Sequence, residues 1–343
     1  MTETLTRIAL AGRPKGAPTL DHFRLESDPM PVPGKGEFLV RVLWLSLDPY
    51  MRGRMDDAKS YAAPVPIGGT MEGGAVAEVV QSNHPDFKPG DIVVHRFGWC
   101  SHAVSDGTDV RKVDASVAPV STALGVLGMP GHTAWVGLND IAGAKAGETI
   151  VVSAATGAVG SLVCQLAREK GMTVIGVAGG ADKCAYAEAE LGCTVCLDHK
   201  ALDGPALEAA IAEAAPKGVN VYFENVAGKT LEAVLPNMAV HGRIAVCGMI
   251  SWYSGADLSQ IMPLPKAWRA ILTKRLMVRG FIIFDHNDRF DAFVADVAPM
   301  IRDGRVKYRE TVAEGLENAP AAFLQLLQGG NFGKQLVRVA KDA

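Results

Sequence analysis

Two patterns of hydrophobic positions follow each other along the chain. In the first third, short apolar runs separated by turns that carry Pro and Gly predict strands at residues 37–46, 74–80 and 91–95. Short strands of this kind are typical of a small, irregular β-barrel. From about residue 131 to about residue 286, apolar runs alternate with segments of helical spacing, and the runs lie at residues 150–154, 173–178, 194–197, 219–225, 243–248 and 276–284. Strands with continuous apolar character, joined by helices, predict a doubly wound parallel sheet of the α/β class.

The end of the chain returns to strand, helix and strand. The runs 306–312 and 335–339 are strand-like, and the helical run 319–327 between them is followed by two glycines. A chain of 343 residues is also longer than a single core usually supports. We therefore expect two domains, with boundaries at residues 1–130 for the barrel, 131–303 for the parallel sheet, and 304–343 for a segment that rejoins the barrel.

A turn with two glycines joins the first parallel strand to the helix after it. The turn is Gly157-Ala158-Val159-Gly160-Ser161, and the helical run that follows it ends at Gly171. Pyrophosphate needs backbone N–H donors at a helix N-terminus with no side chain in the way, and Gly157 and Gly160 satisfy this condition. The pattern indicates a dinucleotide site, with an ordinary turn between strand and helix as the alternative, and Ala155 replaces its first glycine.

The end of the next strand distinguishes NADH from NADPH. A free ribose 2′-hydroxyl usually meets an Asp or Glu about 20 residues after the glycine turn, whereas a 2′-phosphate needs a cation and no acid there. Here the strand ends in Ala178-Gly179-Gly180, and Lys183 follows at the start of a helix predicted over 183–191. This favours NADPH. Two other interpretations stay open: Asp182 binds the ribose, or Asp182 caps the helix and Lys183 is a solvated charge.

Composition and charge narrow the class of protein. The net charge is -3 and basic residues do not cluster, which argues against a nucleic-acid partner. We recognise neither a signal peptide nor an apolar run that could span a bilayer, so we expect no membrane partner and a soluble, cytoplasmic protein. The 6 cysteines are scattered through apolar strands and helices, as expected for reduced thiols in a core.

Candidate chemical groups lie in the loops after the later strands, because ligands of a doubly wound sheet bind at the carboxyl ends of its strands. Tyr253 follows the strand 243–248, where a phenol could donate a hydrogen bond to a substrate oxygen; an aromatic plug in the loop is the alternative. Asp198 and His199 follow the third strand on the expected adenosine side, and a surface turn is an equally fair interpretation of this pair.

Groups that other dehydrogenases use are missing from the sequence. Catalytic zinc needs a Cys or His set with an open position, and structural zinc needs four closely spaced cysteines. Cys193 and Cys196 would point to opposite sides of a strand, and Cys100 and His102 lack further ligands, so we expect no metal. No tyrosine is followed four residues later by lysine, the dyad that lowers the pKa of a phenol for carbonyl reduction. Reduction of an isolated carbonyl is therefore not favoured.

Eight motifs are specific in combination. They are LSLDPYMRGRM at 45–55, GGTMEGG at 68–74, LGVLGMPGHTA at 124–134, AATGAVG at 154–160, FENV at 223–226, CGMIS at 247–251, GLENAPAAF at 315–323 and GNFGK at 330–334. With them the chain resembles, over nearly its whole length, the zinc-independent medium-chain dehydrogenase/reductases, specifically the NADPH-dependent double-bond reductases. That group includes leukotriene/prostaglandin reductases, plant alkenal reductases and bacterial curcumin reductases. The resemblance implies a Rossmann sheet together with a GroES-like barrel.

Matched motif by motif, the resemblance also implies an NADPH site. The residues expected there are Gly157, Ala158, Val159, Gly160 and Ser161 at the pyrophosphate, Lys183 at the 2′-phosphate, His199 near the adenosine phosphate, Asn225 at the ribose, and Cys247, Gly248, Ile250, Ser251, Tyr253, Phe281, Ile282, Ile283 and Asn331 at the nicotinamide half, together with Thr133. Two departures stand out. His199 occupies a position where many relatives have tyrosine, and residues 285–287 differ from several relatives at the rim of the substrate pocket.

The reaction implied is reduction of the C=C bond of an α,β-unsaturated ketone or aldehyde. Hydride from NADPH reaches the β-carbon, negative charge moves to the carbonyl oxygen, and the α-carbon takes a proton, so conjugation removes the need for zinc. One preorganised donor to that oxygen contributes on the order of 3 kcal/mol. Tyr253 and the cofactor ribose hydroxyl are the expected donors, and Tyr50 is either a second wall or donor, or a barrel residue that only stacks.

Two other functions remain open at this point. One is an NADPH:quinone oxidoreductase on the same scaffold, and the other is a catalytically silent protein that binds NADPH as a sensor or binds RNA. We also expect a homodimer, since relatives pair the edge strand 276–284 across a dimer and an uncovered edge is a liability.

Overall fold

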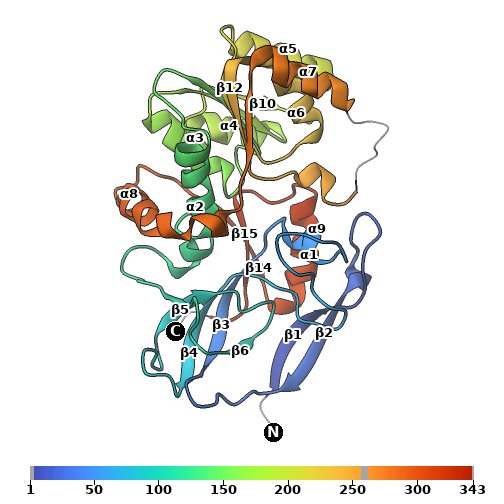
Figure 1. Ribbon diagram of the computed structural model, residues 1–343. Helices are drawn as coiled ribbons and strands as arrows, with labels where there is room; N and C mark the ends of the chain where they lie inside the picture. The colour runs from blue at the N-terminus through green and yellow to red at the C-terminus, as the bar shows by residue number, and fades with distance from the viewer. Residues whose placement is uncertain (1–3, 256–261, 342–343) are drawn as a thin grey trace. The chain divides into compact units, whose positions relative to one another are not determined.

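The computed structural model describes residues 4–255 and 262–341 (Figure 1). The chain forms two compact units: unit 1 is Met1–Gly125 with Glu310–Ala343, and unit 2 is Val126–Arg309. Within the described residues, no helix has both the length and the apolar character needed to cross a membrane.

Unit 2 contains a sheet of six strands in the order β10-β9-β8-β11-β12-β13, in which every neighbouring pair is parallel. The strands are β8 (Thr149–Ser153), β9 (Thr173–Ala178), β10 (Val195–Asp198), β11 (Val219–Glu224), β12 (Met238–Val246) and β13 (Met277–Gly280). The helices are α2 (Met129–Val136), α3 (Gly160–Glu169), α4 (Ala181–Ala189), α5 (Gly204–Ala214), α6 (Gly228–Val234), α7 (Leu264–Lys274) and α8 (Phe290–Arg302). The strand order reverses direction between β8 and β11, which confirms the predicted doubly wound sheet.

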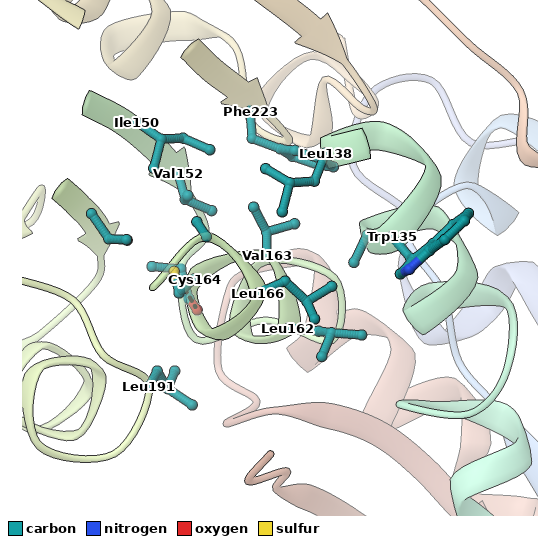
Figure 2. Packing of buried hydrophobic residues seen from close by; sticks show 14 of the residues in the cluster. Trp135, Leu138, Ile150, Val152, Leu162, Val163, Cys164, Leu166, Leu191 and Phe223 are labelled. Atoms are coloured by element: carbon teal, nitrogen blue, oxygen red, sulfur yellow. Dashed lines mark hydrogen bonds between the residues drawn. The ribbon is translucent and has the colours of Figure 1, made fainter. Parts of the chain in front are cut away.

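The two faces of this sheet have separate cores, because successive side chains of a strand point to opposite faces. Ile150 and Val152 of β8 pack with α2, α3, α4 and α8, whereas Val151 packs with α5 and α6. Figure 2 shows Val163 of α3 in one cluster with Val152 and with Phe223 of β11. The continuous apolar run of the sequence therefore reflects burial on both faces.

Several predicted boundaries differ from the observed ones. β9 has the predicted bounds, but the strand predicted over 276–284 ends at Gly280, and Ile283–Arg289 form a 3-10 helix, η7. The prediction was wrong there because the neighbouring β12 ends at Val246, opposite Gly280, and leaves the chain no partner beyond it. Likewise, α4 begins at Ala181 rather than at Lys183.

Unit 1 is rich in strands from both ends of the chain. Its elements are β1 (Thr4–Leu10), β2 (Phe23–Pro29), β3 (Phe38–Ser46), β4 (Ala75–Ser82), β5 (Ile92–His95), β6 (His102–Ser105), β7 (Arg111–Lys112), β14 (Glu310–Glu314) and β15 (Lys334–Arg338), with the helices α1 (Met51–Arg54) and α9 (Ala319–Leu327). One sheet runs β14-β15-β3-β4-β5-β7 with β6 also on β3, and β1 and β2 form a hairpin that the sequence pattern did not predict. Antiparallel pairing of β15 with β3 ties the end of the chain into this unit.

Four thiols gather in the core of unit 2: Cys164, Cys184, Cys193 and Cys196. The sulfurs of Cys193 and Cys196 lie on one side, since a Cβ placed on Gly176 would be 2.9 Å from the first and 3.1 Å from the second. The expectation that they point to opposite sides was wrong. Cys193 lies before β10, so its side chain does not follow the alternation of side chains along that strand. Both pack as core residues, and the described residues contain no group of three His, Cys, Asp or Glu suited to a metal.

Candidate active site

The turn after β8 is shaped by two close backbone approaches. Gly157 N–H donates to the Ala154 carbonyl at 2.8 Å, and a Cβ on Gly160 would lie 2.3 Å from that same oxygen. A side chain at residue 160 therefore cannot fit without moving the backbone. Because α3 begins at Gly160, the turn brings the positive end of a ten-residue helix next to Ala158 and Val159.

Lys183 lies half-buried in the first turn of α4, at the end of β9. Burial, and then the neighbouring Lys200 ammonium, lower the pKa of Lys183, so two cations face the same region. The N-cap of α4 is Gly180, which rules out Asp182 as the cap of a helix over 183–191. Asp198 organises this region instead, because its Oδ1 accepts hydrogen bonds from Gly180 N–H and Lys200 N–H, each at 2.8 Å.

His199 also lies at this end of the sheet. A Cβ on Gly179 would be 2.9 Å from the His199 Nε2 atom, so the ring packs directly over the loop after β9. Burial, and then the Lys229 ammonium, lower the pKa of His199. The imidazole is therefore neutral at pH 7. Lys229 also donates to the His199 carbonyl, which fixes the loop after β10 to the start of α6.

The loop after β11 is fixed by Ser153 at the end of β8. Asn225 donates from its backbone N–H to Ser153 Oγ at 2.8 Å and from Nδ2 to the Ser153 carbonyl at 2.7 Å. The neighbouring Val226 carbonyl accepts from Ser251 Oγ at 2.6 Å. Residues predicted for the ribose and nicotinamide sides, Asn225 and Ser251, are thus brought together through one turn.

Tyr253 closes the loop that follows β12. Its phenol oxygen accepts a hydrogen bond from Met249 N–H at 3.2 Å, and a Cβ on Gly248 would also be 3.2 Å from that oxygen. A phenol can both accept and donate a hydrogen bond through its oxygen. The loop places the other predicted residues of this segment, Cys247 and Ile250, beside Glu224 and Asn225: Cys247 N–H donates to the Glu224 carbonyl and Ile250 N–H to the Asn225 carbonyl.

The remaining predicted residues lie in different places. Phe281 packs close to Gly137, where an added Cβ would be 2.9 Å from its ring, and Ile282 precedes Ile283, the first residue of η7. Thr133 is buried in α2, and its hydroxyl donates to the Met129 carbonyl at 2.7 Å, so this donor is used within the helix.

Tyr50 and Asn331 belong to unit 1. Tyr50 follows Asp48 and Pro49 after β3, and burial, followed by the Asp48 carboxylate, raises the pKa of its phenol well above the ordinary value. The phenol is therefore protonated at neutral pH. Asp48 is itself held by Lys334 at 2.6 Å, and Asn331 Nδ2 donates to the Gly333 carbonyl in the segment before β15.

Comparison with known proteins identifies the family of this chain. Residues 6–113 match the family described as the N-terminal domain of oxidoreductase, and residues 158–298 match the family described as zinc-binding dehydrogenase. The NADPH-dependent curcumin reductase of Escherichia coli (strain K12) is 48% identical over 338 residues, which cover 98% of this chain and 97% of that protein. The NADP(+)-dependent 2-alkenal reductase of Nicotiana tabacum is 40% identical over 311 residues, 90% of this chain and 89% of that protein.

A solved structure is similar along the whole length. The crystal structure of CurA from Vibrio vulnificus in complex with NADPH has a TM-score of 0.93 and 46% sequence identity, and the match covers 98% of this chain and 100% of that chain. The chain belongs to the zinc-independent medium-chain dehydrogenase/reductases, in the group of NADPH-dependent double-bond reductases. It is thus an NADP-dependent oxidoreductase of this family.

The residues of this medium-chain reductase fit the dinucleotide that its family uses. Glycines at 157 and 160 leave the helix N-terminus open to a pyrophosphate, and Lys183 with Lys200 provides positive charge for a 2′-phosphate. β9 itself ends at Ala178 without a carboxylate, and the Asp198 carboxylate next to it accepts from Gly180 N–H and Lys200 N–H. The site therefore favours the phosphorylated cofactor.

Two residues of the site were not singled out from the sequence. Ser153 and Glu224 end the neighbouring parallel strands β8 and β11, and both are fully enclosed. Glu224 is visible in the FENV motif, but nothing local assigns it a role. Its contact with Ser153 spans 71 residues of sequence, so only the pairing of the two strands reveals it.

Proposed function

We propose that this protein reduces the C=C bond of α,β-unsaturated ketones and aldehydes with NADPH. The observation that carries the proposal is the setting of Tyr253, whose phenol oxygen accepts a hydrogen bond from Met249 N–H in the loop after β12, since a phenol is a group that can donate as well as accept. Membership of the double-bond reductase group supports this substrate class, since relatives at 40% to 48% identity are a 2-alkenal reductase and a curcumin reductase.

We assign the cofactor-binding domain to residues 131–303, a range that lies within unit 2, and the catalytic barrel to residues 1–130 with 304–343. In this assignment Gly157 to Ser161 hold the pyrophosphate, Lys183 the 2′-phosphate, His199 the adenosine phosphate and Asn225 the ribose. The nicotinamide half is lined by Cys247, Gly248, Ile250, Ser251, Tyr253, Phe281, Ile282, Ile283 and Asn331, with Thr133 in its wall.

Bound NADPH supplies the hydride that reaches the β-carbon of the substrate. The role of Tyr253 is to donate a hydrogen bond to the carbonyl oxygen as negative charge develops there, which lowers the barrier because the donor is already in place. Tyr50 keeps its proton at neutral pH, since burial and Asp48 raise its pKa, and we assign it the role of a second donor or wall. Conjugation of the alkene with the carbonyl makes one or two such donors sufficient.

An assay of the purified protein tests the substrate class. A panel of enals, enones and quinones is used, and each compound is assayed with NADPH and with NADH. We expect substrate-dependent oxidation of NADPH with enals and enones, loss of the C=C bond with the carbonyl retained, and much slower rates with NADH. Turnover of quinones alone would instead identify a quinone oxidoreductase. Oxidation of NADPH at the background rate with every compound would leave only cofactor binding, and the proposal would fail.

We further propose a homodimer formed at the outer edge of the parallel sheet. β13 is the last strand in the sheet order, and Met277 and Val278 are 45% and 46% exposed. Trp268 on α7, the helix before this strand, is 66% exposed. A second copy that pairs β13 with β13 would satisfy the edge and cover these side chains. Light scattering should give a molar mass twice that of the chain. For Val278→Lys, the measured mass should fall to that of a single chain.

We propose a cytoplasmic location, supported by the six free cysteines. Cell fractionation with an antibody against the chain tests it, and recovery in a membrane or secreted fraction would contradict it.

A further inference from the structure

Glu224 has an unusual setting for a carboxyl group. It ends β11, is 2% exposed, and its Oε1 atom accepts hydrogen bonds from Val226 N–H at 2.7 Å and from Ala227 N–H at 2.9 Å. Ser153 Oγ lies 3.1 Å from the same oxygen. These three donors therefore meet one oxygen, while Oε2 is buried without a hydrogen-bond partner among the described residues. The buried Tyr222 phenol is a further polar neighbour of this carboxyl.

The turn that Glu224 holds is strained. Ala227 has φ 65° and ψ −154°, a combination that a residue with a Cβ rarely adopts, and its side chain is 1% exposed. Such a conformation persists only when its surroundings impose it. The hydrogen bond from Ala227 N–H to Glu224 is a direct constraint of this kind, and Gly228 follows with φ 53°.

The same turn anchors the loop that carries Tyr253. The Val226 carbonyl accepts from Ser251 N–H at 3.0 Å as well as from Ser251 Oγ. The Glu224 carbonyl accepts from Cys247 N–H at 2.9 Å and Gly248 N–H at 3.0 Å. A change in the turn is thus transmitted to residues 247, 248 and 251 of the segment 247–253 through these hydrogen bonds.

We infer that Glu224 is a positioning residue: its buried carboxyl holds the strained turn 225–228 and, through it, fixes the loop that aims the Tyr253 phenol. The inference rests on the proposed function, because it gives Tyr253 a substrate oxygen to aim at. Burial also raises the pKa of Glu224, which agrees with a group that acts as a hydrogen-bond acceptor rather than as a surface charge. Glu224 itself is not placed against substrate or cofactor.

Two substitutions separate the acceptor from the charge. Glu224→Gln keeps a carbonyl oxygen for Val226 and Ala227, removes the ability to ionise and places an amide NH2 where Oε2 stood. Glu224→Met has a similar length but accepts no such hydrogen bonds, so the turn loses its hold. We expect the Gln variant to keep kcat within a small factor of the parent, and the Met variant to lose about 100-fold in kcat, the cost of a misplaced catalytic group. KM for NADPH should change much less than kcat.

Relief of the strain provides an independent test. Ala227→Gly allows the turn its conformation without a constraint, since glycine adopts positive φ freely. Added to Glu224→Met, it should restore kcat by about tenfold, whereas alone it should leave kcat nearly unchanged. Glu310→Met is the matched control: it removes a partly buried carboxyl that accepts from Ser121 Oγ at 3.0 Å in unit 1, and it should lower the melting temperature without changing kcat.

The outcomes are distinguishable. If the parent protein turns over no enone, the proposed function fails before this test begins. If the parent is active but the Met variant keeps its kcat, or if Gln loses as much as Met, Glu224 does not position the loop. Should Glu224→Met not fold, Ser153→Ala replaces it, since this variant removes the acceptor of Asn225 N–H; a kcat like that of the parent would then overturn the inference.

Discussion

The adenosine and nicotinamide ends of the proposed cofactor site lie along one sheet but are built by different means. After β8 and β9, the backbone itself forms the site: Gly157 and Gly160 remove side chains, and Gly180 caps α4. After β11 and β12, side chains form the site: the buried Ser153 and Glu224 hold the turn, and the exposed Ser251 ties it to the next loop. The first end is specified by local sequence, and the second depends on contacts between distant residues.

The largest effect is expected from a substitution at the adenosine end, which the backbone forms. In Gly160→Val, a Cβ that would stand 2.3 Å from the Ala154 carbonyl forces the turn apart, so NADPH binding should be lost in a calorimetric titration. Gly12→Ala is the control, since a Cβ there meets nothing within 4 Å. Retention of parent affinity by the Val variant would show that the close approach at Gly160 does not matter for the cofactor.

The next test addresses the side-chain end. Tyr253→Phe removes a donor to the substrate oxygen and should lower kcat for an enone by about 100-fold. NADPH affinity should stay nearly intact, because the pyrophosphate turn is untouched. Steady-state rates and a fluorescence titration of NADPH measure the two effects separately, and an unchanged kcat removes Tyr253 from the reaction.

A smaller effect, on the KM for NADPH, is expected from substitution of Lys183. Lys183→Ala removes a charge-assisted contact to the 2′-phosphate and should raise KM for NADPH by about tenfold or more, while KM for NADH stays the same. Lys170→Ala, at an exposed position after α3, is the control. An equal rise for both cofactors would contradict the assignment, and an effect of Asp182→Asn on NADH would favour Asp182 as the ribose ligand.

The smallest effect concerns His199. Burial and Lys229 lower its pKa below the ordinary 6.5, so the ring gains its charge only as the pH falls through that lowered value. If the ring contacts a phosphate, the complex binds the proton more tightly than the free protein does. NADPH affinity should therefore rise a few-fold relative to His199→Tyr as the solution is acidified. Titration of the parent and of His199→Tyr with NADPH under identical conditions cancels the contribution of the cofactor's own ionisation. If the two affinities change with pH in parallel, the contact between His199 and a phosphate is contradicted.

The same contrast explains what the sequence could predict. Glycine spacing and continuous apolar runs depend on neighbouring residues, so the parallel sheet and the turn at 157–161 were predictable. β13 was predicted too long because its end is set by β12, and the cysteine pair was misjudged because Cys193 lies before its strand. Glu224 and Ser153 escaped notice because 71 residues separate them, and a buried acid in a strand has no local signature.

The enclosed thiols have a consequence for a protein that handles reactive alkenes. Electrophiles of the proposed substrate class alkylate proteins by Michael addition to thiolates, which form readily only when a cysteine is accessible and its pKa is low. Here burial raises the pKa of Cys100 and of Cys247 to about 12, and burial likewise raises that of Cys196 beside Gly176. These thiols are thus held in the protonated form at neutral pH, in which they add to such compounds far more slowly than a thiolate does.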